Sequence, residues 1–278
     1  MEIWKNTKDA AEEGEHKVRT ISIINLKGGV AKTISSTSIA YILSSRGYKV
    51  LLVDNDKQGD ASRGLGCRTQ NGEGIDRVMT ERMPNMKQLI KNTEFENLHV
   101  ITANMRLLMA NKEVMLDQTR PQHDRIKKAL EKVKEDYDFC IIDNAPDINI
   151  STINALTASD DVLIPLEIDD NTTEGMKELL EQIENTREDL NPNLCHVRCF
   201  ITKYDKRNEA HGQGLEYLKN RTHYPLMRTR IRFSRKVAEC TYARKPVPLY
   251  SPQSAAAKDY ERLTTEYLKM IGGVDNGI

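Results

Sequence analysis

The chain has 278 residues, and its 41 lysines and arginines balance its 41 aspartates and glutamates. That length can bury the core of one large α/β domain, and the balanced charge alone indicates no polyanionic partner. The start is polar, the five cysteines have no paired spacing and no apolar run reaches about 18 residues, so we expect a cytoplasmic protein without a signal peptide, a disulfide framework or a membrane span.

Strands and helices alternate along the sequence. The apolar run Ile21–Ile24 predicts a first strand, residues 33–46 a helix, and residues 49–54 a second strand that is apolar throughout and therefore buried on both faces. The alternation predicts a mostly parallel, twisted sheet with helices on both faces, as in P-loop nucleoside triphosphatases. We expect one domain over residues 18–278, after a short N-terminal arm at 1–17. The later elements are expected as strands at 98–102, 137–143, 161–165 and 196–202, and as helices at 123–134, 172–188 and 254–271.

The segment between the first strand and the first helix, Lys27-Gly-Gly-Val-Ala-Lys-Thr33, has the composition of a phosphate-binding loop. Backbone N–H groups of such a loop and of the helix that follows point at the anion, and a lysine adds a point charge. The usual pattern G-x-x-x-x-G-K-[ST] would need glycine where this chain has Leu26 and Ala31. We expect the loop to function if Ala31 has a negative φ, with Lys32 at the β- and γ-phosphates and the Thr33 hydroxyl on Mg²⁺.

Three carboxylates follow predicted strands on either side of this loop. Asp54 and Asp56 come at the end of the second strand, and Asp143 ends the strand at 137–143. In parallel sheets, ligands bind outside the carboxyl ends of the strands, where carboxylates can hold Mg²⁺ through water and orient an attacking water. One such acid is usually a helix cap or a loop residue. Three of them beside a phosphate loop predict a magnesium-dependent nucleotide site.

Charge is unevenly distributed over the last third of the chain. Residues 167–189 hold nine acids and two bases, a net charge of −7, whereas residues 198–245 hold thirteen bases and four acids, a net charge of +9. A basic segment in a balanced protein predicts a surface for DNA, and the alternative is a solvated face whose bases pair with the acidic segment. The candidates for contacts with DNA phosphates are Arg198, Arg221, Arg228, Arg230, Arg232, Arg235 and Lys236.

Four ordered motifs resemble those of the ParA/MinD family of ATPases, and most closely its ParA branch of DNA-partition ATPases. The family has a deviant Walker A loop, Lys-Gly-Gly-Val-Gly-Lys-Thr-Thr, followed by Asp-x-Asp-Pro-Gln-Gly-Asn, by Asp-x-Pro-Pro with Thr-x-Asn-Ala-Leu and Val-Leu-Ile-Pro, and by Pro-Ile-x-x-Tyr-x-Pro-x-Ser. The matching segments of this chain are 27–34, 54–60, 143–146 with 152–156 and 162–165, and 245–254. The resemblance covers residues 18–270.

This resemblance implies a role for each matched residue. Lys27 is the signature lysine that crosses to the nucleotide of a second subunit in the ATP-bound dimer, and Lys32 is the loop lysine of its own subunit. Asp56 positions the hydrolytic water, and Thr33, Asp56 and Asp143 serve Mg²⁺, with Asp54 behind them. The residues implied in binding ATP or ADP are Lys27, Gly28, Gly29, Val30, Ala31, Lys32, Thr33, Ile34, Lys203 and Ile231.

The resemblance also implies a function. It is that of a slow ATPase whose ATP-bound homodimer binds DNA without sequence preference on the nucleoid, with hydrolysis stimulated by a centromere-binding ParB-like adaptor. The chain departs from the family pattern at three positions, of which the last two concern the expected rate of hydrolysis more than nucleotide binding. Ala31 replaces a glycine, Ile34 replaces a threonine, and Lys57 replaces the proline after Asp56, so the loop should be stiffer and the segment after Asp56 less rigid and more basic.

Other classes that share the loop remain as alternatives. A MinD-like membrane-cycling ATPase would end in a basic amphipathic helix, a nitrogenase-reductase-like electron carrier would need a cluster cysteine in each of two loops, and a small-molecule kinase or ligase would transfer phosphate to an acceptor other than water. Here only Cys67 lies in a glycine-rich loop, which argues against the electron carrier. The last predicted helix carries acids on its polar face, so we expect no membrane partner. Its apolar residues have the spacing of a core-facing helix: Tyr260, Leu263, Tyr267, Leu268 and Ile271.

Overall fold

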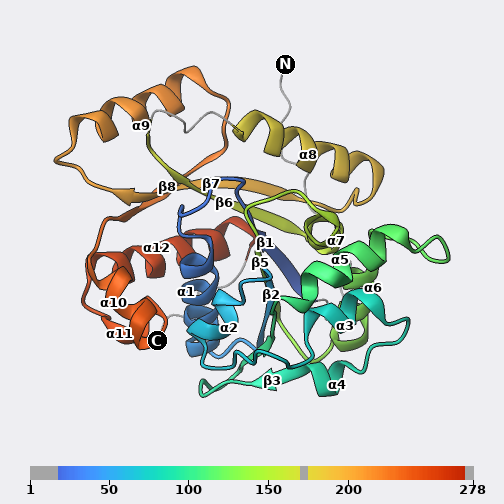
Figure 1. Ribbon diagram of the computed structural model, residues 1–278. Coiled ribbons are helices and arrows are strands. Elements are labelled where there is room, and N and C mark those ends of the chain that lie inside the picture. Colours follow the sequence, from blue (N-terminus) through green and yellow to red (C-terminus); the bar gives the residue numbers. More distant parts are fainter. Residues whose placement is uncertain (1–17, 170–174, 273–278) are drawn as a thin grey trace.

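Eight strands form one sheet in the computed structural model, which describes residues 18–169 and 175–272 (Figure 1). Their order is β3-β4-β2-β5-β1-β6-β7-β8, and all neighbours are parallel except β3 and β4. The predicted α/β fold is confirmed. The predicted arm at 1–17 lies outside the described residues. The strands are β1 (Arg19–Ile23), β2 (Val50–Asn55), β3 (Ile90–Asn92), β4 (Leu98–Ile101), β5 (Phe139–Asn144), β6 (Asp161–Glu167), β7 (His196–Tyr204) and β8 (Leu226–Arg232).

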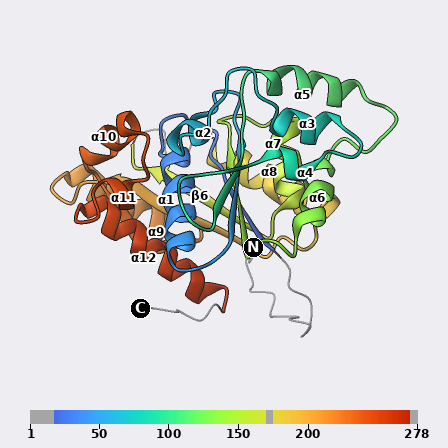
Figure 2. The same cartoon turned by 90° about the horizontal axis from the view of Figure 1, so that it is seen from below.

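Helices cover both faces of the sheet (Figures 1 and 2). Alternating side chains of β2 divide the core, because successive residues of a strand point to opposite faces. Val50 and Leu52 pack in the cluster of α1 and α12, and Leu51 and Val53 in the cluster of α3, α5 and α6. The helices are α1 (Lys32–Ser45), α2 (Asp60–Gly64), α3 (Ile75–Thr80), α4 (Met86–Leu89), α5 (Arg106–Leu116), α6 (Arg125–Leu130), α7 (Ile150–Ala158), α8 (Met176–Asp189), α9 (Glu209–Arg221), α10 (Lys236–Ala243), α11 (Val247–Tyr250) and α12 (Ala255–Met270), with a 3₁₀ turn at Glu131–Val133.

The observed elements differ from the predicted ones in specific places. The helix expected at 123–134 is shorter, since α6 gives way to the 3₁₀ turn, and the first residues of the helix expected at 172–188 lie outside the described residues. The sequence did not predict α5, α9 or β8. In β8, arginines alternate with buried residues such as Met227 and Ile231, which gives an edge strand the composition of a charged loop. Helix α9 contains Gly212 and Gly214, which lower helix propensity.

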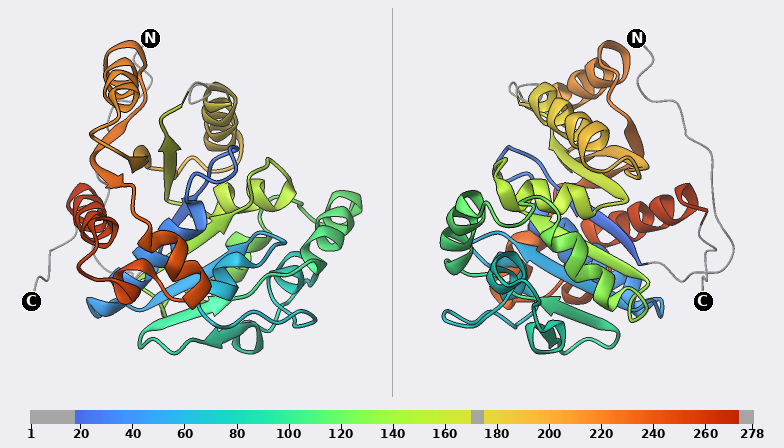
Figure 3. Two further views of the ribbon diagram at one scale, coloured as in Figure 1. Left: turned by 60° about the vertical axis from the view of Figure 1, so that its left-hand side comes forward. Right: turned by 90° about the vertical axis from the view of Figure 1, so that its right-hand side faces the viewer.

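Gly214 has a packing reason to be glycine. A Cβ atom at this position would lie 2.3 Å from the Cγ2 atom of Ile168, so a larger residue would force α9 away from the sheet. Helices α8 and α9 lie over the β6–β8 half of the sheet (Figures 1 and 3), where Leu215 and Leu218 join the cluster around Val162. The glycines that obscure the helix in the sequence therefore permit its close approach.

The last helix, α12, is a core helix as predicted. Tyr260, Leu263, Tyr267 and Leu268 are each at most 1% exposed and pack against the sheet and α1. The Tyr267 hydroxyl donates a 2.6 Å hydrogen bond to the buried Asp161 carboxylate, at the amino end of β6. No helix in the described part of the chain has both the length and the apolar character needed to cross a bilayer.

Candidate active site

The loop between β1 and α1 is held at its start by Asn25. Asn25 accepts a 2.9 Å hydrogen bond from the backbone N–H of Lys27 through Oδ1 and donates to the Pro165 carbonyl oxygen at 2.8 Å through Nδ2. Gly28 and Gly29 are exposed, and Gly29 has a φ of 78°, where glycine is favoured. A Cβ atom at either glycine would meet nothing within 4 Å, so this part of the loop is open on its outer side.

Ala31 does not have the negative φ that the sequence analysis expected. It caps the amino end of α1 with φ 69° and ψ 31°, in the left-handed region, and its carbonyl oxygen accepts from the Ser35 N–H at 2.9 Å and the Ser35 hydroxyl at 2.7 Å. An L-residue in this region costs about 1–2 kcal/mol relative to a right-handed one. The expectation was wrong because the loop must reverse direction just before the helix, which is where family members have glycine.

The two lysines of the loop have different surroundings. Lys32 is 8% exposed, and its Nζ donates to the Lys27 carbonyl oxygen at 3.0 Å, which folds its side chain back over the loop. Burial lowers the pKa of Lys32, while the nearby carboxylates of Asp143, Asp56 and Asp147 raise it. The Lys27 side chain is one-third exposed and forms an ion pair with Asp169, which follows β6. Lys32 therefore belongs to its own loop, and Lys27 lies at the surface.

Strand register places two carboxylates side by side beneath the loop. Asp54 of β2 is paired with Asp143 of β5, and both are fully buried. The Asp143 Oδ1 atom accepts from the Ser36 hydroxyl at 2.7 Å. Burial, and then the neighbouring Asp54, raise the pKa of Asp143 to about 7, although hydrogen bonds from Ser36 and Thr33 lower it. Two buried carboxylates this close favour a cation between them and the loop.

Asp54 and Asp56 have different surroundings and different roles. Asp54 accepts from the Ser62 N–H at 2.7 Å, from the Ser62 hydroxyl at 2.6 Å and from the Asp56 N–H at 3.2 Å. It thereby holds the segment from β2 to α2 in place, and burial raises its pKa to about 6. Asp56 is partly exposed at the mouth of the site, where its Oδ1 accepts from the Gln58 N–H at 2.9 Å. Of the two, Asp56 is the one placed to reach a bound molecule.

The residues present fit a magnesium ion. The Oδ2 atom of Asp143 is buried and has no hydrogen-bond partner in the described part of the chain, and the Thr33 side chain interacts with the same carboxylate. Hydroxyl and carboxylate oxygens are ligands that Mg²⁺ prefers. Among the described residues there is no group of three or more His, Cys, Asp or Glu side chains that could hold a metal. Protein sites for Mg²⁺ usually have one or two carboxylates, with phosphates and water as the other ligands, and Thr33 and Asp143 match that pattern.

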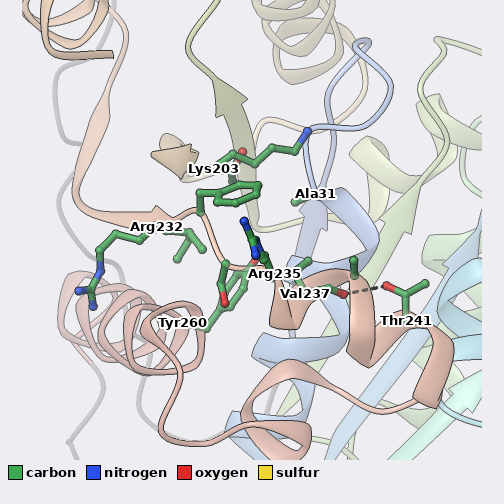
Figure 4. A pocket seen from close by; sticks show the side chains of 12 residues that line it. Ala31, Lys203, Arg232, Arg235, Val237, Thr241 and Tyr260 are labelled. Atoms are coloured by element: carbon green, nitrogen blue, oxygen red, sulfur yellow. Dashed lines mark hydrogen bonds between the residues drawn. The ribbon is translucent and has the colours of Figure 1, made fainter. Parts of the chain in front are cut away.

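A cavity of about 330 Å³ lies beside the loop, between the ends of β7 and β8 and the helices α10 and α12 (Figure 4). It brings together Ala31, Lys203 and Ile231, which the sequence had grouped around a nucleotide. Figure 4 shows Arg235 between Lys203 and Tyr260, and Arg232 extending away from them. The Lys203 side chain pairs with Glu167 at 2.8 Å. The cavity is also lined by Phe233 and Tyr260, and by three residues of α10 that the sequence had not grouped with the nucleotide, Val237, Ala238 and Thr241.

The predicted DNA-contact residues do not share one environment. The Arg232 guanidinium donates to Asp259 of α12 at 2.7 and 2.8 Å, and Lys236 pairs with Glu239 at 2.7 Å, so their partners lie outside the acidic segment 167–189. Arg230 lies over the Tyr204 ring at 5.2 Å, and Arg235 lines the cavity. The exposed members are Arg221 at the end of α9, Arg228 and Arg232 of β8, Arg235 and Lys236, while Arg198 of β7 is half-buried.

Comparison with known proteins settles the family. A family model described as an AAA domain matches residues 18–196. The chain is 36% identical over 248 residues to the sporulation initiation inhibitor protein Soj of Bacillus subtilis strain 168, covering 89% of this chain and 97% of that protein. It belongs to the ParA/MinD family of ATPases. The family resemblance deduced from the four motifs is thus confirmed, and the chain is an ATPase.

Other members and a solved structure extend this family likeness. The chromosome partitioning protein ParA of Caulobacter vibrioides strain NA1000 / CB15N is 34% identical over 254 residues, covering 90% of this chain and 94% of that protein. The crystal structure of cobyrinic acid a,c-diamide synthase from Mycobacterium smegmatis, with a bound ATP analogue and magnesium, superposes with a TM-score of 0.79 at 26% identity. It covers 92% of this chain and 96% of that one.

Proposed function

We propose that this ATPase is a DNA-partition protein. In this proposal it binds ATP with Mg²⁺, forms a homodimer with the nucleotide between the subunits, and binds DNA without sequence preference in that state. It hydrolyses ATP slowly until a centromere-binding ParB-like adaptor stimulates it. Support comes from relatives named for chromosome partitioning, in Caulobacter vibrioides and in Treponema pallidum at 33% identity, and from the arrangement of the loop.

The observation that carries the proposal is the different placement of the two loop lysines. Lys32 folds back over its own loop, where it would hold the β- and γ-phosphates together with the backbone N–H groups of residues 28–33. Lys27 starts from the same loop but extends along the surface to Asp169. A lysine on the outer side of a phosphate loop can reach the nucleotide of a second subunit, where it would stabilise the charge that develops on the transferred phosphate.

The remaining residues have complementary tasks in this scheme. Thr33 and Asp143 would hold Mg²⁺, which supplies charge neutralisation at the β- and γ-phosphates when bound. Asp56, at the mouth of the site, would orient the attacking water, and Asp54 keeps Asp56 in place through its N–H. After hydrolysis Lys27 would lose its γ-phosphate partner, so the ATP dimer would dissociate, and nucleotide state would control DNA binding.

The basic end of the sheet would carry the DNA. Arg221 and Arg228 are exposed, and contacts from such residues to phosphates confer affinity and salt dependence without reading bases. The candidates that are already paired, such as Arg232, would contribute less.

The test is DNA binding to an unrelated duplex, measured with ATP, with ADP and without nucleotide, for the wild type, Lys27→Gln and the matched surface control Lys91→Gln. We expect tight binding with ATP alone, loss of dimer and of DNA binding in Lys27→Gln, and no change in Lys91→Gln. Binding that ignores the nucleotide, or a Lys27→Gln dimer of normal strength, would contradict the proposal. Flotation with anionic vesicles in the same nucleotide states distinguishes it from the membrane-cycling alternative.

A further inference from the structure

A second pocket lies far from the phosphate loop. It has a volume of about 350 Å³ and is formed by the end of α3, by α6 and by the segments 81–84 and 119–121. These elements belong to the β2–β4 end of the sheet, whereas the strands β7 and β8 and the helices α9 and α10, which carry the candidates for DNA contact, lie at the other end (Figure 1). We name it the α3–α6 pocket. Its charged lining residues are five cations, Arg82, Arg120, Arg125, Lys128 and Lys132, and two acids, Glu81 and Asp124.

Two of the arginines give this pocket a fixed frame. Arg125, with a side chain 5% exposed, donates to the Met79 carbonyl oxygen at 2.7 Å and to Asp117 at 2.8 Å. Arg120 donates to the Thr80 carbonyl oxygen at 2.8 Å and pairs with the same Asp117 at 3.0 Å. One carboxylate thus serves two guanidinium groups, and hydrogen bonds from Thr119 and these arginines lower the pKa of Asp117. The end of α3 and the segment 117–121 are tied together, so the pocket is preformed.

The other cations at the pocket face solvent. Lys128 is exposed and pairs with Asp124 at 2.7 Å. Arg82 and Lys132 are also exposed, and within the described residues neither has an acidic partner within 4 Å. These two side chains can pair with a carboxylate from outside without first giving up an internal ion pair.

Exposed apolar side chains adjoin the same pocket. Met83, between the lining residues Arg82 and Pro84, is 79% exposed. Met115 and Leu116, which directly precede Asp117 at the end of α5, are 63% and 80% exposed. Large apolar groups with this exposure are unusual on a surface that has no partner, and methionine adapts to varied partners. Cationic and apolar features therefore occur together at the α3–α6 pocket.

We propose that the α3–α6 pocket binds a segment of another protein that combines acidic residues with large apolar ones. Carboxylates of the segment pair with Arg82 and Lys132, and its apolar side chains cover Met83 and Leu116. A protein segment fits better than nucleic acid, because its apolar side chains can cover Met83 and Leu116, whereas a phosphate backbone offers no apolar groups to them. This partner would bind while the opposite end of the sheet stays available.

The experiment measures fluorescence anisotropy of a labelled synthetic peptide of about 12 residues, in which glutamates flank two leucines and two phenylalanines, with the full chain. Arg82→Glu/Lys132→Glu should weaken binding at least about tenfold, and Met83→Ser/Leu116→Ser at least about threefold. The control Lys87→Glu/Lys91→Glu, on the neighbouring α4 and β3, should stay within about twofold. All three variants should keep the circular dichroism spectrum of the wild type and its ATP-dependent DNA binding.

Several results would overturn the inference. The inference is wrong if the wild type does not bind the peptide at about 1 mM. It is also wrong if the wild type and Arg82→Glu/Lys132→Glu bind the peptide with equal affinity. A peptide with glutamine in place of every glutamate should bind much more weakly, and equal binding would remove the role of charge. If a DNA duplex competes with the peptide and loses affinity in the same variant, the pocket is a nucleic-acid surface instead.

Discussion

The phosphate-loop end and the basic β7–β8 end of this molecule use charge in opposite ways. At the loop, Lys32, Asp54 and Asp143 are buried and converge, because Lys32 begins α1 and the two aspartates lie one residue from the ends of neighbouring strands. At the basic end, neighbouring arginines have separate surroundings. Both Arg232 and Arg228 are exposed, but Arg232 is bound to Asp259, whereas Arg228 has no ion pair among the described residues. The comparison teaches that the spacing of motifs along the sequence predicts which residues meet in one site. A count of basic residues does not predict which of them are free of internal ion pairs and able to bind a partner.

Removal of a single charge should therefore have its largest effect at the loop. Lys32→Met keeps the length of the side chain but removes the charge, and we expect the ATPase kcat/KM to fall by about 100-fold or more, as when one electrostatic donor is lost from other active sites. Phosphate release measures this, with Lys91→Met as the control. A fall of less than about tenfold would show that the loop does not depend on Lys32 as its buried position indicates.

Among the basic residues, substitution of Arg232 should mainly lower stability, and substitution of Arg228 should mainly weaken DNA binding. Arg232→Gln leaves the carboxylate of Asp259, which is 3% exposed, without its main partner, and we expect a loss of about 1–3 kcal/mol in the free energy of unfolding. Arg228→Gln should change that free energy by less than about 0.5 kcal/mol. Urea unfolding measures both.

The same pair is then compared on DNA. Arg228→Gln should weaken binding and reduce the slope of log affinity against log salt by about 1, since one phosphate contact is lost. Arg232→Gln should leave that slope unchanged under conditions in which the variant is folded. The reverse outcome, with Arg232 carrying the salt dependence, would mean that its ion pair with Asp259 opens on DNA.

The ion pair with Asp169 should compete with the contact that the Lys27 side chain is proposed to make with a second subunit. Asp169→Asn removes the charge of the partner that Lys27 has in the single chain, and we expect ATP-dependent dimerisation at a concentration lower by a factor of about 2–5, the range for a partly exposed ion pair. Analytical ultracentrifugation with ATP measures it. Weaker dimerisation in Asp169→Asn would instead assign Asp169 to the interface itself.

The smallest effect is expected at Ala31. Glycine would relieve about 1–2 kcal/mol of left-handed strain but would also cost about 0.5–1 kcal/mol through greater freedom of the unfolded chain. We therefore expect Ala31→Gly to raise the free energy of unfolding by up to about 1 kcal/mol, whereas Ala40→Gly, inside α1, should lower it by a similar amount. Denaturant titration compares the two variants. If Ala31→Gly is destabilised, the backbone of Ala31 is not strained as its positive φ indicates.

Much of the fold and of the loop could be predicted because the relevant signals are local. The apolar run of β2 is read directly from its residues, and the parallel alternation brings Asp54 and Asp143 to one edge. What failed has physical reasons. The φ of Ala31 depends on how the chain must turn to meet α1, and β8 is hidden because an edge strand can alternate arginines with buried residues. The roles of the individual loop residues stay predictions until the variants above are measured.

The sequence by itself determined the family, the α/β alternation and the set of charged groups around the loop, since these depend on residue type and spacing along the chain. Only the tertiary structure decided which cations are available. It paired Lys27 with Asp169 and Arg232 with Asp259, and it assembled the α3–α6 pocket from the separate segments 78–84 and 119–132. The reason is that the availability of a charge depends on its neighbours and its burial, and both come from parts of the chain that meet only on folding.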